Sequence, residues 1–164
     1  MIDINAVTPL VAPLADGLRA KGWRIACAES CTGGLVAAAC TSLAGSSDWF
    51  ERGFVTYSNE AKTEQLGVEA ALINAHGAVS AEVAAAMASG ALVHSRADIA
   101  LAVTGIAGPG GGVPGKRVGT VWLALAQRGG AASVELLQLS GDRASVRAQT
   151  VVIALQRLQQ LCAE

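Results

Sequence analysis

Hydrophobic and polar residues follow two patterns along the chain, one typical of helices and the other of strands. Five segments have the apolar spacing or the alanine content of helices: 8–20, 34–43, 59–66, 80–94 and 142–161. Five short apolar runs are typical of strands: 23–28, 50–57, 99–104, 118–126 and 133–139. Because the two kinds of segment are interspersed, the sequence predicts an α/β fold.

Polar residues that favour helix starts mark where several of these helices begin. Thr8, followed by Pro9 at the first helical position, fits the start of the first helix. Asn59 fits the start of the third helix, which a glycine after residue 66 would end. Ser80 and Asp142 precede the last two helices in the same way.

The last two predicted strands are separated by a Gly129-Gly130 pair, which favours a β-hairpin. A hairpin makes its strands antiparallel, so the sheet is expected to be mixed. No linker or repeat divides the sequence, and 164 residues fit one domain. We therefore expect a single domain over residues 1–164, folded as a three-layer α/β/α sandwich around a mixed β-sheet.

Composition and charge exclude several classes of protein. Hydrophobic residues make up 52% and charged residues 15% of the chain, which excludes intrinsic disorder. The 12 basic and 13 acidic side chains lack the basic excess that a nucleic-acid surface needs, and the longest uncharged run, 30–47, is too rich in glycine, serine and threonine to span a membrane. The N-terminus does not resemble a signal peptide. The four cysteines fit neither a disulfide framework nor a zinc pattern, so a cytoplasmic protein is expected.

The first candidate site is segment 28–34 (AESCTGG), where a predicted strand gives way to a helix. Ligands of open α/β sheets bind at the carboxyl ends of strands, and free N–H groups there can stabilise an anion or an oxyanion. Ser30 stands at the tip of the turn, and Gly33 and Gly34 leave the N–H groups approachable. The alternative is a plain turn in which Ser30 or Thr32 only caps the helix.

The second candidate is Lys62, in the first turn of the helix that follows a strand ending at Tyr57. The helix macrodipole disfavours a cation at this position and makes the amine easier to deprotonate. A neutral lysine can act as the general base for a serine hydroxyl. A solvated surface lysine is the alternative.

The third candidate is the loop after the strand at 99–104, which begins with 104–112 (TGIAGPGGG). Residues 110–116 fit G-x-x-x-x-G-K, but Arg117 occupies the Ser/Thr position that would bind Mg²⁺, and a strand follows instead of a helix. We therefore reject a nucleoside-triphosphatase loop. A Rossmann dinucleotide site has little support, because no G-x-G-x-x-G run opens a helix here.

The fourth candidate is the pair Arg143 and Arg147 in the last helix. At helical spacing both project onto the same face as the apolar stripe of that helix, where an anion should meet them. The anion is either a phosphate of a ligand or a carboxylate of the protein, within the chain or across a dimer interface.

Other reactive residues have weaker support. His76 and His94 are isolated, and without a G-x-S-x-G elbow they give a Ser-His-Asp triad little support. Cys31 is either a nucleophile with a lowered pKa at a helix N-terminus or, more commonly, a small buried residue.

Taken together, these segments resemble the CinA C-terminal domain family, whose characterised members are nicotinamide-nucleotide amidohydrolases. The resemblance covers about residues 8–160 and rests on 28–34, 57–59 (YSN) with Lys62, 66–68 (LGV), 77–80 (GAVS), 104–109 and 141–143 (GDR) with Arg147. Arg117 departs from the family pattern, which usually has proline there. The larger N-terminal domain of full-length CinA proteins is absent from the sequence, so the chain resembles the stand-alone deamidases.

The resemblance implies hydrolysis of the carboxamide of nicotinamide mononucleotide to nicotinic acid mononucleotide and ammonia, a step in pyridine nucleotide salvage. It also implies a homodimer with no metal and no cofactor. In this scheme Ser30 attacks the amide carbon, and Lys62, helped by Tyr57, takes the hydroxyl proton and later protonates the departing ammonia. N–H groups near Thr32, Gly33 and Gly34 would stabilise the oxyanion.

The remaining expected contacts concern the rest of the nucleotide. The loop from Thr104 through Gly105 to Gly108, together with Arg143 and Arg147, is expected to hold ribose and phosphate, and Asn59 is expected to contact the substrate. Two other functions stay open. The domain could bind a pyridine nucleotide without turning it over, or it could hydrolyse the amide of another substrate.

Overall fold

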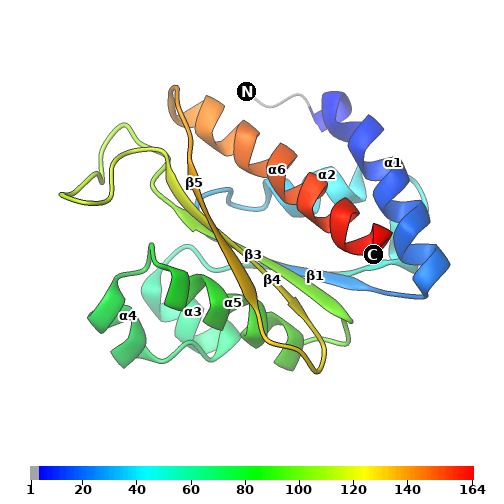
Figure 1. Ribbon diagram of the computed structural model, residues 1–164, viewed down its shortest axis with the longest axis horizontal. Helices are drawn as coiled ribbons and strands as arrows, with labels where there is room; N and C mark the ends of the chain where they lie inside the picture. Colours follow the sequence, from blue (N-terminus) through cyan, green and yellow to red (C-terminus); the bar gives the residue numbers. More distant parts are fainter. Residues whose placement is uncertain (1–3) are drawn as a thin grey trace.

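The computed structural model describes residues 4–164, which form three layers around a central sheet (Figure 1). The sheet has five strands in the order β2-β1-β3-β4-β5. β1 (Ile25–Glu29) pairs in parallel with β2 (Phe50–Val55) and with β3 (Ile99–Gly105). β4 (Thr120–Gln127) and β5 (Ser133–Gln138) form an antiparallel hairpin beside β3. The predicted mixed sheet is therefore confirmed.

Helices cover both faces of this sheet. One face carries α1 (Ile4–Lys21), α2 (Leu35–Thr41) and α6 (Arg143–Ala163), and the other carries α3 (Asn59–Leu66), α4 (Ala70–His76) and α5 (Ala81–Val93) (Figure 1). A short 3-10 helix, Ser46–Asp48, leads into β2. This arrangement confirms the predicted three-layer sandwich. Among the helices of residues 4–164, none has the length and apolar character needed to cross a membrane.

The two faces of the central strands carry side chains of different size. Large side chains on the α1 and α6 side include Ile25, Ile99, Leu101 and Val103. The α5 side is lined by alanines: Ala26, Ala28, Ala100, Ala102, Ala124 and Ala126. Because successive strand residues point to opposite faces, this alternation gives α5 a shallow surface against which it can pack closely. The core is thus built almost entirely from aliphatic residues.

The first helix begins earlier than predicted. α1 starts at Ile4, so Thr8 lies inside the helix and does not cap it, and Pro9 and Pro13 are both interior. Each interior proline removes a helical hydrogen bond. The buried stripe of α1, formed by Val7, Val11, Leu14 and Leu18, packs into the same core cluster as α6, and this packing outweighs the loss.

Helix caps agree with the prediction at two helices and differ at a third. Ser80 and Asp142 cap α5 and α6, as predicted. In α3, Ser58 is the cap, because its hydroxyl accepts a hydrogen bond of 3.0 Å from the Ala61 N–H, whereas Asn59 is the first helical residue. The prediction of Asn59 as the cap was one residue too late.

One α-helix, α4, was not predicted at all. α4 has only seven residues, and its N-cap residue, Glu69, makes no capping hydrogen bond through its side chain. It therefore lacks the polar signal that marks α3 and α5.

The strands end within two residues of their predicted ends, with β2 closing at Val55 and β3 reaching Gly105.

Candidate active site

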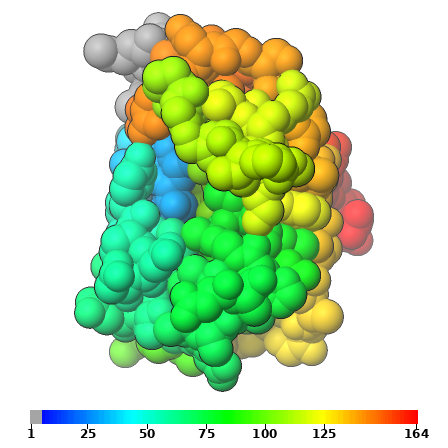
Figure 2. Space-filling model, turned by 90° about the vertical axis from the view of Figure 1, so that its left-hand side faces the viewer, coloured from blue at the N-terminus to red at the C-terminus, as the bar shows by residue number. Residues whose placement is uncertain are grey.

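The carboxyl ends of β1, β2 and β3 meet at one edge of the sheet, and the first two candidate segments lie there. Ser30 directly follows β1, and its N–H donates to the Val103 carbonyl of β3 at 3.0 Å. Lys62 lies in α3, just beyond β2. Figure 2 shows this edge: the β3–β4 loop (lime to yellow) and α3 (teal) border a hollow in which the end of β1 (blue) is visible.

Lys62 contacts Ser30 directly. Its Nζ lies 3.2 Å from Ser30 Oγ, 2.9 Å from the Thr56 carbonyl and 3.5 Å from the Ser58 carbonyl. In the ammonium form these three oxygens accept the three N–H groups. In the neutral amine two N–H groups suffice for the carbonyls, and the lone pair is left for the serine hydroxyl. The arrangement allows the Ser30 proton to pass to the amine.

The environment of Lys62 favours this neutral form. The residue is only 1% exposed, which excludes the solvated lysine considered as the alternative. Burial lowers the pKa of the Lys62 amine, because a charged group loses its hydration inside the protein. The sequence pointed to the helix macrodipole as the cause, whereas the structure identifies burial as the main one.

Glu29, the last residue of β1, is a buried charged residue to which the sequence reasoning gave no role. Its Oε2 accepts hydrogen bonds from Thr32 Oγ1 at 2.6 Å, the Gly34 N–H at 3.1 Å and the Val36 N–H at 3.0 Å, and Oε1 accepts one from the Ala37 N–H at 2.8 Å. The carboxylate thereby satisfies the first N–H groups of α2. A signal was present, because this glutamate interrupts an otherwise uncharged run from 25 to 36.

These contacts decide which N–H groups of the turn remain free. The Gly34 N–H is taken by Glu29, and the Gly33 N–H donates to the Ser30 carbonyl at 3.0 Å. Neither is available to a substrate, which differs from the expectation for these two glycines. Within the described part of the chain, the N–H groups of Cys31 and Thr32 donate to no other residue.

Cys31 does not have the lowered pKa considered from its position. The side chain is buried, and burial raises the pKa of its thiol to about 11. The thiol is therefore protonated at neutral pH and a poor nucleophile. The structure supports the alternative of a small buried residue.

Arg143 and Arg147 both reach toward this edge from α6. Arg143 donates to the Gly108 carbonyl at 3.1 Å and to the Tyr57 hydroxyl at 2.8 Å. Arg147 donates to the carbonyls of Cys31 and Thr32, at 3.1 and 3.0 Å. Protein oxygens thus meet both guanidinium groups, but they are backbone and phenol oxygens, not the carboxylate that the sequence suggested as one possibility. Tyr57 is 59% exposed.

A hollow of about 480 Å³ lies beside the two arginines. Its lining consists of Ala107, Pro109, Val118, Gly141, Asp142, Arg143, Ala144 and Arg147. This volume is within the usual range for small-molecule sites. The third and fourth candidates therefore meet at one place, between the β3–β4 loop and the start of α6.

Three other residues predicted to bind the substrate do not line the hollow beside the arginines. Thr104 is buried and its hydroxyl donates to the Ala78 carbonyl at 2.8 Å, while Gly105 packs against Val121 of β4. Asn59 borders a separate hollow of about 310 Å³ between α3 and α4. The structure does not bring Asn59 to the hollow beside the arginines.

Known proteins resemble this chain over most of its length. Nicotinamide-nucleotide amidohydrolase PncC of Escherichia coli K12 is 52% identical over 147 residues, which cover 90% of this chain and 89% of that protein. The protein of the same name from Pseudomonas putida is 50% identical and covers 98% of this chain and 100% of its own length. A CinA-like protein of Geobacter sulfurreducens is 53% identical, and the match spans 94% of this chain but 37% of that protein.

Solved structures agree with the fold. The competence/damage-inducible protein CihA of Agrobacterium tumefaciens superimposes with a TM-score of 0.92 at 43% identity, covering 96% of both chains. A competence damage-inducible protein of Klebsiella pneumoniae gives a TM-score of 0.92 at 42% identity, covering 96% of this chain and 98% of its own. Residues 7–162 match the CinA C-terminal domain, and the chain belongs to that family.

Proposed function

We propose that this protein hydrolyses the carboxamide of nicotinamide mononucleotide to nicotinic acid mononucleotide and ammonia. The observation that carries the proposal is the 3.2 Å contact between the buried Lys62 amine and the Ser30 hydroxyl. The names of relatives at 50–52% identity supply the substrate. The contact and the names of the relatives together support acyl transfer by a serine nucleophile with a lysine base.

The first half of the reaction forms an acyl-enzyme. Ser30 Oγ attacks the carboxamide carbon while its proton passes to the neutral Lys62 amine. The negative charge that develops on the amide oxygen would be stabilised by the N–H groups of Cys31 and Thr32, which donate to no other residue among those that the structure describes. Lys62 then donates the proton to the amide nitrogen, the C–N bond breaks, and ammonia leaves.

The second half restores the enzyme. A water molecule gives one proton to Lys62 and attacks the ester carbon, and the bond to Ser30 Oγ breaks as Lys62 returns the proton to that oxygen. The products are a free serine and a nicotinic acid group, which loses its proton to solvent and leaves as the carboxylate. One buried amine therefore serves as base and acid in each half, which requires that it change protonation state easily.

Tyr57 and Arg143 are better suited to hold the substrate than to transfer protons. The Tyr57 hydroxyl accepts a hydrogen bond from Arg143, and the ring is exposed at the rim of the site. Arg143 also borders the 480 Å³ hollow, where a phosphate group would meet its charge. We therefore assign the nucleotide phosphate to this hollow and the reacting carboxamide to Ser30.

The test is an assay of the purified protein with nicotinamide mononucleotide, in which ammonia and nicotinic acid mononucleotide are both measured. Nicotinamide, nicotinamide riboside and glutamine serve as comparison carboxamides. We expect the mononucleotide to give the highest kcat/KM. Binding of the mononucleotide without release of ammonia would favour a binding module, and faster hydrolysis of another carboxamide would change the substrate.

A further inference from the structure

Arg147 joins α6 to the turn that carries the nucleophile. Its Nε donates to the Cys31 carbonyl and its Nη2 to the Thr32 carbonyl, although the residues are more than a hundred positions apart in the chain. The side chain is half-buried. The planar guanidinium offers two parallel N–H groups, and here both are used by neighbouring carbonyls of one turn.

The rest of this turn is held from other directions. The Ser30 N–H is bound to β3, and the Glu29 carboxylate holds the Thr32 hydroxyl and the start of α2. Arg147 supplies the contacts on the α6 side. The turn that presents Ser30 to Lys62 is therefore fixed between an anion and a cation, each hydrogen-bonded to the main chain.

We propose that Arg147 is a positioning residue, which holds the peptide groups after Ser30 in the orientation that the reaction needs. This inference rests on the proposed function. A trans peptide is planar, with its C=O and N–H pointing in opposite directions, so holding the Cys31 carbonyl also fixes the direction of the Thr32 N–H. The guanidinium charge further polarises that peptide and strengthens the N–H as a donor to an oxyanion.

The competing role for Arg147 is direct binding of the substrate phosphate, since it also borders the 480 Å³ hollow. The two roles predict different kinetics. A phosphate ligand affects KM for the mononucleotide and leaves a phosphate-free substrate unaffected. A positioning residue affects kcat for both substrates by a similar factor, because the reacting amide is the same.

The experiment compares Arg147→Lys with Arg157→Lys, a matched change on the same helix. Arg157 pairs with Glu135 at 2.7 and 2.8 Å, away from the site, so its variant should keep wild-type kinetics. For Arg147→Lys we expect kcat to fall about 10- to 100-fold with nicotinamide mononucleotide and with nicotinamide riboside, since small misplacements have effects of this order. A rise in KM for the mononucleotide alone would overturn the proposal.

A second measurement separates this inference from the choice of substrate. Phenylmethanesulfonyl fluoride carries neither phosphate nor nicotinamide. Ser30 Oγ forms a bond to its sulfur as fluoride leaves, and the serine proton passes to Lys62. We expect Arg147→Lys to slow this reaction about as much as it lowers kcat, at a temperature where both variants are folded by circular dichroism. An unchanged sulfonylation rate would overturn the positioning role, whereas failure of the mononucleotide assay in the wild type would reject only the substrate.

Discussion

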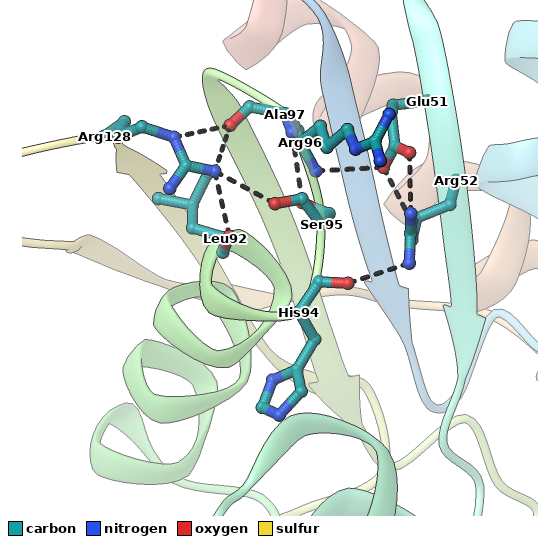
Figure 3. A network of polar contacts seen from close by, with 8 residues as sticks. All are labelled: Glu51, Arg52, Leu92, His94, Ser95, Arg96, Ala97 and Arg128. Atoms are coloured by element: carbon teal, nitrogen blue, oxygen red, sulfur yellow. Dashed lines mark hydrogen bonds and ion pairs between the residues drawn. The ribbon is translucent and has the colours of Figure 1, made fainter.

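Arginine side chains donate to backbone carbonyls at both ends of the sheet. At one end the carbonyls belong to the C-terminus of a helix, and at the other they belong to the turn that carries Ser30. Near the amino ends of β1 and β3, Arg128 donates to the carbonyls of Leu92, Ser95 and Ala97, where α5 ends (Figure 3). At the carboxyl ends, Arg147 donates to two carbonyls of the Ser30 turn. The contacts are chemically alike, so the difference between the ends lies in what surrounds them.

At the amino end the arginines complete a helix. Arg52 reaches the end of α5 from the side opposite to Arg128, donates to the His94 carbonyl, and pairs with Glu51 at 2.7 Å (Figure 3). Cations at this position compensate the negative end of the helix macrodipole. At the carboxyl end, the arginine contact lies next to the Ser30 hydroxyl and the Lys62 amine, whose pKa is lowered. The comparison predicts that changes at one end affect reaction and changes at the other affect stability.

The largest effect is expected at Ser30. Ser30→Ala removes the nucleophile and should lower kcat on the order of 10⁶-fold. The free energy of unfolding should change little, because the hydroxyl is only partly buried and its contact is with Lys62. Turnover by mass spectrometry of both products, with chemical denaturation alongside, measures the two quantities.

A matched serine lies at the other end of the sheet. Ser95 Oγ accepts a hydrogen bond from the Ala97 N–H at 3.2 Å, so Ser95→Ala should lose some stability and keep wild-type kcat. Retention of most turnover in folded Ser30→Ala would show that another group is the nucleophile.

Lys62→Met should lower kcat about 10²- to 10⁴-fold, the usual range for loss of a general acid–base group. In the wild type, the base must be neutral, so kcat/KM should rise with pH up to the pKa of Lys62. Burial lowers that pKa, and the rise should therefore end below 10.5, the ordinary value for lysine. The methionine variant should lack this dependence, and Lys21→Met, which removes an amine stacked over Trp23, should retain it.

The same pKa has a consequence for stability. Because the folded-state pKa of Lys62 is lowered, the unfolded chain binds more protons than the folded chain between the two pKa values. Stability of the wild type relative to Lys62→Met should therefore rise with pH through that window. Urea denaturation at several pH values measures the difference, and a fall with rising pH would contradict the buried-amine interpretation.

Glu29→Gln should lower both the unfolding free energy and kcat. Glutamine replaces one acceptor oxygen by an NH₂ group that must face an N–H or O–H donor, and unfolding free energy should fall by about 1–3 kcal/mol. Because Glu29 holds the turn beside Ser30, kcat should fall as well. Glu51→Gln at the amino end, which loses a pair with a half-exposed arginine, should have a smaller effect on stability and none on kcat. An unchanged kcat in Glu29→Gln would separate this carboxylate from the reaction.

The sequence could predict the layers and the edge where the site lies, but not the groups that hold it. Strand and helix periods, with the glycine pair at 129–130, specify a mixed sheet with helices on both faces. Since carboxyl ends of parallel strands share an edge, Ser30 and Lys62 could be placed near each other. Arg147 was a candidate, but its partners were expected to be anions, and Glu29 was given no role. Both bind backbone groups, which every residue has, so the sequence does not show which ones they hold. The homodimer stays a prediction.

The smallest effect is expected for Arg128→Met, which makes the sharpest comparison with Arg147. Its guanidinium donates to three carbonyls of the α5 end, and its loss should lower the unfolding free energy by about 0.5–1 kcal/mol. Because Arg128 is exposed, the difference should shrink at high salt. Thermal unfolding at two salt concentrations and steady-state kinetics measure both quantities. If Arg128→Met lowered kcat as much as Arg147→Lys, the turnover would depend on the whole sheet and not on the turn that Arg147 contacts.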